Sequence, residues 1–401
     1  MKRILIRASK TPFENLATGP IPRQDLRAVY RSLNRAGTKN IGNLVFAHSA
    51  YKALSSSDAE LTIDNYRLSL DDNYADIADE INERFDVFVI PLCNSFRPSY
   101  KDVLVRMTNT IRKLKIPCVV TGVGAQTNLA GDVSRLDVMK DEAKDFVAAI
   151  LDRSESIGVR GPITRDFIKR LGFDDSRIDV IGCPSMFYNG KNMKISKPDS
   201  LGAVALNLSS AVKDPAYLNF ASYFNENPEG VTYVPQVREL MPSFFKKRLP
   251  SPDAAPSIDT PTPRVIAREQ VAFLCDVVPW LDFMRTQSFA IGTRIHGNVV
   301  PLLAGTPAHV IAHDSRTLEL AEYFEIPKTE VPSIRKFDLR ETFERSDYSK
   351  LEKNHPARLA TYAKFLERNG LDHILHDEQQ LAAHDAAVRS ALAKAGIPAA
   401  A

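Results

Sequence analysis

Hydrophobic and polar positions form short apolar runs that alternate with longer segments in which apolar residues recur at helical spacing. The short runs predict strands at Arg3–Arg7, Asp86–Pro91, Pro117–Thr121, Ser156–Val159, Ile178–Ile181, Ala203–Leu208, Val231–Pro235, Gln287–Ile291 and Ala308–His313. The periodic segments predict helices at Asn40–Leu54, Lys101–Leu114, Val138–Arg153, Pro162–Gly172, Val265–Cys275, Pro279–Arg285, Asn298–Leu303, Thr317–Phe324 and Tyr348–His376. Alternating strands and helices are typical of α/β proteins with mainly parallel sheets.

The same pattern divides the chain into two halves. Residues 191–201 are polar and basic without apolar periodicity, so they predict a linker between residues 1–190 and 202–345. Each half then forms a Rossmann-like, doubly wound α/β domain, and the two domains face each other across a cleft. Residues 346–401 predict C-terminal helices with an Ala-rich tail, and the stretch between Arg7 and Lys39 predicts a polar connection.

Composition agrees with two domains and excludes some other classes. A chain of 401 residues, 44% hydrophobic and 25% charged, can bury two cores, and a net charge of +3 gives no argument for nucleic acid. The start of the chain lacks a signal-peptide pattern and no apolar run reaches the ~20 residues of a membrane span, so we expect a cytoplasmic protein. Four widely spaced cysteines predict reduced thiols and no metal site.

The most informative stretch is the turn predicted at Thr293–Gly297, between a strand and a helix. At the carboxyl edge of a parallel sheet, free backbone N–H groups and the helix dipole favour an anion there. Arg294 adds a planar charged fork suited to phosphate or carboxylate, and His296 adds a side chain that titrates near neutrality. The alternative is structural: Arg294 caps a helix or pairs with an acid, and His296 is a satisfied core histidine.

Polar residues that follow other predicted strands reach the same edges of the sheets. Arg160 ends a strand and faces a helix start, as Arg294 does, and together they predict an anion held between them. The other candidate binding residues are Gly42, Asn43, Asn94, Gly124, Gln126, Asn207, Thr293, Gly297 and Arg316, with Asp314 beside them. Simple helix capping remains the alternative for Gly42 and Asn43, and Gly124 also fits a sharp turn that needs glycine for steric reasons.

The stretch GTRIHG at Gly292–Gly297, followed by LAGTP and HDSRTLELAEYFEIP, resembles the C-terminal signature of the polysaccharide pyruvyl transferase family. Residues Ser156–Ser185 are similar to that family's strand, Arg, helix, strand and small-residue/Pro turn. The resemblance implies a GT-B-like fold, with a C-terminal helix that braces the first domain. It also implies transfer of an enolpyruvyl unit from phosphoenolpyruvate onto a sugar. The chain departs from the family at Leu92–Arg97, where a Gly-rich turn is usual, and at Cys183, where an acid is frequent.

With this resemblance, His296, Arg294 and Asp314 become the expected catalytic residues. His296 acts either as a base on the sugar hydroxyl or as a cation beside the departing phosphate, and Asp314 orients it or binds sugar hydroxyls. The expected partners are phosphoenolpyruvate and a glycan or lipid-linked sugar acceptor, with no separate cofactor. Peripheral contact with the inner face of the membrane, self-association, and a ketal or an enolpyruvyl ether as product stay open.

Two other functions fit the same fold. One is a GT-B glycosyltransferase that uses a nucleotide-sugar donor, with Arg160 and Arg294 on its pyrophosphate. The other is a non-catalytic relative that binds a sugar or a phosphate.

The Pro-rich stretch Met241–Pro263 predicts neither a continuous helix nor a strand. It is either a mobile excursion without chemical role, or it brings Phe244–Arg248 into contact with the acceptor or the membrane.

Overall fold

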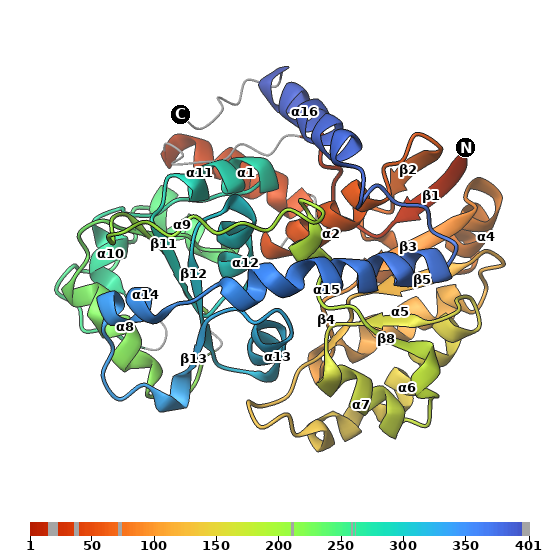
Figure 1. The fold of residues 1–401 in the computed structure, drawn as a ribbon, viewed down its shortest axis with the longest axis horizontal. Coiled ribbons are helices and arrows are strands. Elements are labelled where there is room, and N and C mark those ends of the chain that lie inside the picture. Colours follow the sequence, from red (N-terminus) through yellow and green to blue (C-terminus); the bar gives the residue numbers. More distant parts are fainter. Residues whose placement is uncertain are drawn as a thin grey trace.

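The computed structural model describes residues 1–14, 23–35, 40–70, 74–209, 212–257, 260 and 262–394. Within these ranges the chain forms two parallel α/β domains that lie side by side. Figure 1 shows the N-terminal domain on the right and the C-terminal domain on the left. The fold class expected from the alternation of strands and helices is thereby confirmed.

The N-terminal domain is built on a parallel sheet with the strand order β2-β1-β3-β5. Its strands are β1 (Lys2–Ile6), β2 (Ala59–Ile63), β3 (Val87–Pro91) and β5 (Cys118–Thr121). A parallel bridge from Val123 to Val159 leads on to the pair β7 (Ile157–Val159) and β8 (Ile178–Val180). A second short pair, β4 (Asn94–Phe96) and β6 (Gly124–Ala125), lies beyond the ends of β3 and β5.

Helices cover both faces of this sheet, which explains why β3 and β5 are buried at every position. The face that carries Ile4, Ile6 and Val89 packs in the same apolar cluster as α2, and the face that carries Leu5, Phe88 and Ile90 packs with α4, α5 and α6. The helices of this half are α1 (Arg23–Arg35), α2 (Gly42–Ala53), α3 (Arg67–Leu70), α4 (Tyr74–Arg84), α5 (Lys101–Ile111), α6 (Lys140–Leu151) and α7 (Pro162–Arg170).

The C-terminal domain has a five-stranded parallel sheet in the order β10-β9-β11-β12-β13. Its strands are β9 (Val204–Asn207), β10 (Val231–Tyr233), β11 (Phe289–Gly292), β12 (Ala308–Ala312) and β13 (Lys328–Glu330). Its helices are α8 (Tyr217–Glu226), α9 (Met241–Phe245), α10 (Pro263–Ala267), α11 (Val277–Arg285), α12 (Ile295–Ala304), α13 (Ser315–Tyr323) and α14 (Leu339–Arg345). The strand order reverses between β9 and β11, which makes a crevice at their carboxyl ends.

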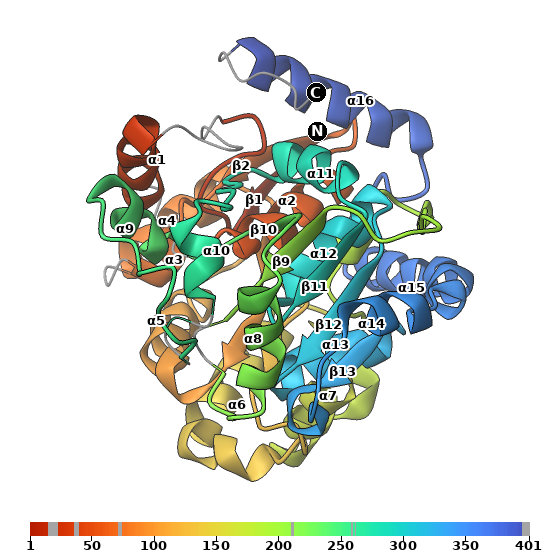
Figure 2. The same ribbon diagram turned by 90° about the vertical axis from the view of Figure 1, so that its left-hand side faces the viewer.

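Two C-terminal helices connect the domains. Figure 1 shows α15 (Ser349–Arg368) running from the C-terminal domain across to the N-terminal one, where Asn369 bonds to Ser156. Figure 2 shows α16 (Glu378–Lys394) lying across the top of the molecule, above α2 and α11. Residues 395–401 of the Ala-rich tail lie outside the described residues.

The polar connection expected up to Lys39 is wrong in its second part, because α1 occupies Arg23–Arg35. Leu26, Val29 and Leu33 are buried along one face of this helix, while charged residues dominate the rest of its sequence. Tyr30 adds an edge-to-face contact with Phe245 of α9, at 5.8 Å between ring centroids. Residues 15–22 and 36–39 of the predicted connection lie outside the described residues.

Several predicted boundaries are also corrected. Helix α12 begins at Ile295, so His296 and Gly297 belong to its first turn and Pro301 lies in its interior. Asn94 lies in the strand β4 and not in a turn, because its segment pairs with β6. The helix expected at Val265–Cys275 ends at Ala267, and the one expected at Tyr348–His376 ends at Arg368.

The Pro-rich stretch is packed and does not present its aromatic side chains to solvent. Phe244 is buried against Phe273, at 5.4 Å between ring centroids, and Phe245 is half-buried against α1. Phe244 is therefore not accessible to an acceptor or a membrane, whereas Lys246, Lys247 and Arg248 of this cluster are exposed. Residues 258, 259 and 261 of the stretch lie outside the described part.

Across the described ranges, no helix combines the length and the apolar character that crossing a bilayer requires.

Candidate functional site

A polar cavity lies where the carboxyl ends of strands from both domains meet. It encloses about 480 Å³ of free space, including its opening to solvent. The residues that line it are Asn40, Asn43, Cys93, Asn94, Arg160, Ser209, Gln236, Thr293, Arg294, Ile295, His296, His313, Arg316 and Thr317. Most of them lie within three residues after the end of a strand, so the parallel topology of both sheets gathers them at one place.

Three guanidinium groups dominate the charge of this cavity. Arg160 comes from the N-terminal domain, and Arg294 and Arg316 come from the C-terminal domain. None of the described residues that line the cavity is a carboxylate. Like charges gathered in a partly buried space repel one another, so such a cavity is suited to an anion with several negative charges.

The position of Arg294 follows from hydrogen bonds around the end of β11. The Asn207 side chain accepts a hydrogen bond from the Arg294 backbone N–H at 2.8 Å, and Thr293 Oγ1 accepts one from the Ser209 N–H at 2.8 Å. Asn298 Nδ2 donates to the carbonyl of Gly292 at 2.9 Å. The residue before α12 is therefore fixed to two strands, and its side chain enters the crevice where the strand order reverses.

His296 lies in the first turn of α12 and meets two small side chains of the other domain. Its Nε2 is 3.2 Å from Ser185 Oγ and 3.9 Å from Cys183 Sγ. Burial, with a smaller effect of the Arg160 charge, lowers the pKa of His296 to about 3. The imidazole is therefore neutral near pH 7, which makes it a proton acceptor and not a cation.

Arg160 and Gln236 have polar atoms that the protein leaves unpaired. Arg160 donates to Cys183 Sγ at 3.6 Å, but its Nε is buried without a hydrogen-bond partner among the described residues. The same holds for Gln236 Nε2. Both side chains are 2% exposed and both line the cavity. Buried donors without partners are rare, so these atoms indicate a site that a ligand or water completes.

Asn94 connects the cavity to further cations. Its amide lies 2.7 Å from Gln126 and 3.0 Å from guanidinium nitrogens of Arg97 and Arg316. Arg316 in turn pairs with Asp314, the N-cap of α13, at 2.8 Å from Nε to Oδ2. These contacts hold Arg316 in place at the rim.

The predicted site residues divide into two groups. His296, Arg294, Arg160, Asn43, Asn94, Thr293 and Arg316 line the cavity. The other predicted residues do not line it but contact residues that do: Gly42, Gly124, Gln126, Asn207, Gly297 and Asp314. The Asn207 side chain instead accepts a hydrogen bond from the Arg294 backbone N–H, and Asp314 caps α13 and pairs with Arg316.

Sequence reasoning missed Gln236, His313 and Thr317 as cavity residues. Gln236 lies three residues after β10, and His313 directly follows β12. The rule that brought Arg160 and Arg294 to attention, a polar residue just after a strand, also applies to these two positions. Thr317 gave no such signal, because it lies inside α13.

A wider cavity adjoins the first one and shares His313 with it. It encloses about 1120 Å³ of free space including solvent. Its lining residues are Arg97, Pro98, Ser99, Gln126, Thr127, Asn128, Arg135, Val212, Lys213, Asp214, His313 and Asp314. Because this cavity contains amides, hydroxyls and both signs of charge, it is suited to a larger polar molecule.

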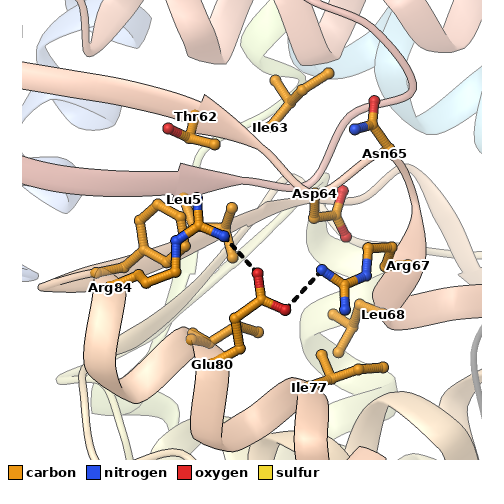
Figure 3. Close-up of a pocket in the computed structure, with 12 residues that line it drawn as sticks. Leu5, Thr62, Ile63, Asp64, Asn65, Arg67, Leu68, Ile77, Glu80 and Arg84 are labelled. Atoms are coloured by element: carbon orange, nitrogen blue, oxygen red, sulfur yellow. Dashed lines mark hydrogen bonds and ion pairs between the residues drawn. The ribbon is translucent and has the colours of Figure 1, made fainter. Parts of the chain in front are cut away.

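A third cavity lies apart, between the edge strand β2 and helix α4 (Figure 3). It shares no lining residue with the other two, and much of its wall is apolar. Figure 3 shows Glu80 between Arg67 and Arg84, with carboxylate–guanidinium distances of 2.8 and 2.5 Å. Since these charges pair with one another, this cavity lacks the unbalanced positive charge of the site between the domains.

No group of three or more His, Cys, Asp or Glu side chains within the described ranges is arranged to hold a metal ion.

The fold and this cavity define a GT-B-like protein: two Rossmann-like domains, each parallel and wound on both faces, with a polar site between their carboxyl edges. A family model described as polysaccharide pyruvyl transferase matches residues 40–236. The resemblance read from the sequence is thereby confirmed over these residues. The match includes Arg160 and ends before Gly292.

The solved structures that match this chain are distant from it in sequence. The UDP-GlcNAc 2-epimerase of Methanocaldococcus jannaschii, in complex with UDP-GlcNAc and UDP, is 12% identical with a TM-score of 0.44; the alignment covers 90% of this chain and 100% of that one. The UDP-GlcNAc 2-epimerase of Neisseria meningitidis is 8% identical with a TM-score of 0.47, covering 92% and 100%. HepE of Anabaena, in complex with UDP and glucose, is 12% identical with a TM-score of 0.44, covering 96% and 100%. No curated protein matches the sequence.

Proposed function

We propose that the protein transfers the pyruvyl (enolpyruvyl) group of phosphoenolpyruvate onto sugar hydroxyls of a polysaccharide or glycolipid precursor. One observation carries this proposal: guanidinium groups from both domains line the same cavity as a neutral, buried imidazole, and none of its described lining residues is a carboxylate. Phosphoenolpyruvate has a phosphate and a carboxylate on three carbons, so it is a compact anion that several guanidinium groups can bind at once.

The proposed reaction forms a pyruvate ketal in two additions. The enol double bond of phosphoenolpyruvate takes a proton on its methylene carbon, which leaves an oxocarbenium-like centre on the adjacent carbon. A sugar hydroxyl adds to this centre and loses its proton, and the C–O bond to phosphate then breaks, with both bonding electrons leaving on the phosphate. Loss of phosphate leaves an oxocarbenium-like centre on the same carbon again, and a second hydroxyl adds to it, loses its proton and closes the ring.

The neutral His296 is suited to accept the hydroxyl proton during the first addition. The guanidinium groups of Arg160, Arg294 and Arg316 stabilise the negative charge of the departing phosphate. Of the two roles considered for His296, base or cation, its lowered pKa favours the base. The adjoining wide cavity is the proposed place of the sugar acceptor, next to the donor across His313.

Incubation of the purified protein with phosphoenolpyruvate and a panel of glycosyl acceptors tests the proposal. We expect release of inorganic phosphate and the mass of a pyruvylated acceptor by mass spectrometry.

His296→Ala should lower kcat roughly 10²- to 10⁴-fold with little change in donor affinity. Arg294→Ala should weaken donor binding roughly 10- to 100-fold, which is the cost of one or two charge-assisted hydrogen bonds.

The matched control is Arg335→Ala, which removes an exposed arginine from the same domain. Release of a nucleotide from a nucleotide-sugar donor, with no reaction of phosphoenolpyruvate, would instead identify a glycosyltransferase. Binding of phosphoenolpyruvate without any turnover on the acceptor panel would favour a non-catalytic relative. Near-normal turnover in both site variants would refute the proposed site.

A further inference from the structure

One face of α13 contacts the other domain at three positions spaced by four residues. Ser315 Oγ accepts a hydrogen bond from the Thr127 N–H at 2.8 Å. Glu319 Oε1 accepts one from the Thr164 N–H at 3.2 Å, and the Tyr323 hydroxyl donates to the Val180 carbonyl at 2.9 Å. Since residues four apart lie on the same side of a helix, these three side chains form a continuous seam between the domains.

Glu319 is the charged member of this seam, and it occupies the N-terminus of α7. Its side chain is 2% exposed, and its second oxygen lies 3.4 Å from Thr164 Oγ1, which itself accepts the Ala125 N–H at 3.0 Å. A Cβ on Gly161, the residue before α7, would lie 2.3 Å from Glu319 Cγ, so only glycine lets the carboxylate approach this closely. The start of α7, which the sequence placed opposite Arg160, is therefore occupied by the carboxylate of Glu319.

The seam is directly connected to two of the guanidinium groups in the site. Arg160 immediately precedes Gly161 and α7 in the N-terminal domain. Arg316 immediately follows Ser315 on α13 in the C-terminal domain. The contact between Glu319 and α7 therefore fixes the two backbone segments that carry Arg160 and Arg316 across the cleft.

We propose that Glu319 is a positioning residue that sets the separation of Arg160 and Arg316, and thereby the affinity for an anionic donor. This inference rests on the proposed function for the identity of the donor. Glu319 does not line the cavity, so it acts through the two arginines and not by touching substrate. An acceptor oxygen at this position matters more than its charge, because the first turn of α7 offers N–H groups that need a partner.

The electrostatic surroundings of Glu319 agree with a role as hydrogen-bond acceptor. Burial raises the pKa of Glu319 to about 7, while the backbone N–H groups of Ile163 and Thr164 and the Arg160 charge act in the opposite direction. Near pH 7 the side chain is therefore a mixture of carboxylate and acid, and one oxygen can accept from Thr164 in either form. A neutral amide of the same shape should therefore keep the contact.

Three variants test this inference: Glu319→Ala, Glu319→Gln, and the control Glu322→Ala, which removes a carboxylate from the exposed face of the same helix. For Glu319→Ala we expect the KM for phosphoenolpyruvate to rise roughly tenfold, which corresponds to one lost hydrogen bond to a charged group, with a smaller change in kcat. Glu319→Gln should restore the wild-type KM within about twofold, and Glu322→Ala should not differ from wild type.

Hydrogen–deuterium exchange at the first turn of α7 gives a second measurement that needs no substrate. Exchange should be faster in Glu319→Ala and unchanged in Glu319→Gln. Unchanged exchange and unchanged KM in Glu319→Ala would overturn the inference while leaving the proposed function intact. If the wild-type protein neither binds nor converts phosphoenolpyruvate, the proposed function fails. Inorganic phosphate binding then serves as the affinity readout, and equal phosphate affinity in wild type and Glu319→Ala overturns the inference.

Discussion

At the scale of single residues, burial changes what the candidate groups can do. The sequence gives His296 a titration near neutrality, but the folded protein lowers its pKa to about 3. Glu319 is changed in the opposite sense, because burial raises its pKa to about 7. Both shifts disfavour the charged form, which is the expected effect of a low-dielectric interior on an acid and on a base.

The lowered pKa of His296 predicts a loss of stability in acid. In the unfolded chain this histidine titrates near 6.5 and in the folded protein near 3, so below about pH 6.5 the unfolded state binds a proton that the folded state does not. Between about pH 7.5 and about pH 5.5 the folded state should lose roughly 1 kcal/mol from this group. Urea unfolding at both pH values should show a smaller loss for His296→Gln than for wild type.

Comparing His296→Gln with wild type isolates the contribution of His296 to the loss of stability in acid. Buried His309 also has a pKa lowered to about 3, but it is present in both proteins and contributes equally to both losses. The exposed His376 supplies the control His376→Gln, which should keep the wild-type pH dependence. Equal losses in wild type and His296→Gln would show that the imidazole is less buried than the structure has it.

At the scale of elements, the start of α12 is set by close contact with the neighbouring strand. A Cβ on Gly297 would lie 2.4 Å from Asn207 Cγ and 2.6 Å from Gln236 Nε2. The sequence assigned Gly297 to the approach of a ligand, but in the structure it makes room for these two side chains. Both matter to the site, since Asn207 holds the Arg294 backbone and Gln236 lines the cavity.

Gly297→Ala should therefore destabilise the protein, although alanine normally stabilises a helix interior by up to about 1 kcal/mol relative to glycine. We expect a loss of about 1–3 kcal/mol, typical of overpacking, together with weaker donor binding. Thermal unfolding measures the first effect. Gly202→Ala is the control, because its nearest non-neighbouring atom is Ser288 Oγ at 3.6 Å, and it should leave stability and binding unchanged. A gain of stability in Gly297→Ala would contradict the packing described for α12.

At the scale of the whole molecule, α16 connects the two domains on the side of α2 and α11 (Figure 2). Lys52 of α2, 2% exposed at its side chain, pairs with Asp385 of α16 at 2.7 Å and stacks over Tyr188. Arg389, one turn further on α16, pairs with Asp282 of α11 in the C-terminal domain at 2.7 Å. One helix thus bonds to both halves of the cleft.

Removing the carboxylate in Asp385→Ala should leave the buried ammonium of Lys52 with only the Tyr188 ring beside it. We expect a loss of about 1–3 kcal/mol, because an uncompensated buried charge is costly while Asp385 itself is partly solvated. Urea unfolding provides the measurement. The control is Glu378→Ala. Glu378 also lies on α16, but its pair with Lys191 is exposed, so its loss should change stability little. Equal stability of Asp385→Ala and wild type would mean that α16 does not hold the domains through this pair.

The sequence by itself determined the fold class and most of the central strands. It also identified two arginines that line the cavity, Arg160 and Arg294. It could do so because buried parallel strands are continuous apolar runs, and because polar residues after such strands must reach the carboxyl edge of a sheet. The edge strand β2 and the charged helix α1 were missed, because their few buried positions are embedded in mostly polar sequence.

Only the tertiary structure decided which candidates meet. It brought His313 and Gln236 to the cavity, moved Asn207 and Asp314 into supporting roles, and filled the start of α7 with Glu319 from the other domain. These outcomes depend on tertiary packing, and contacts between residues far apart in the sequence, such as Thr164 and Glu319, leave no trace in local periodicity. The protonation of His296 belongs to the same group, since it follows from burial and from the charge of Arg160 across the cleft.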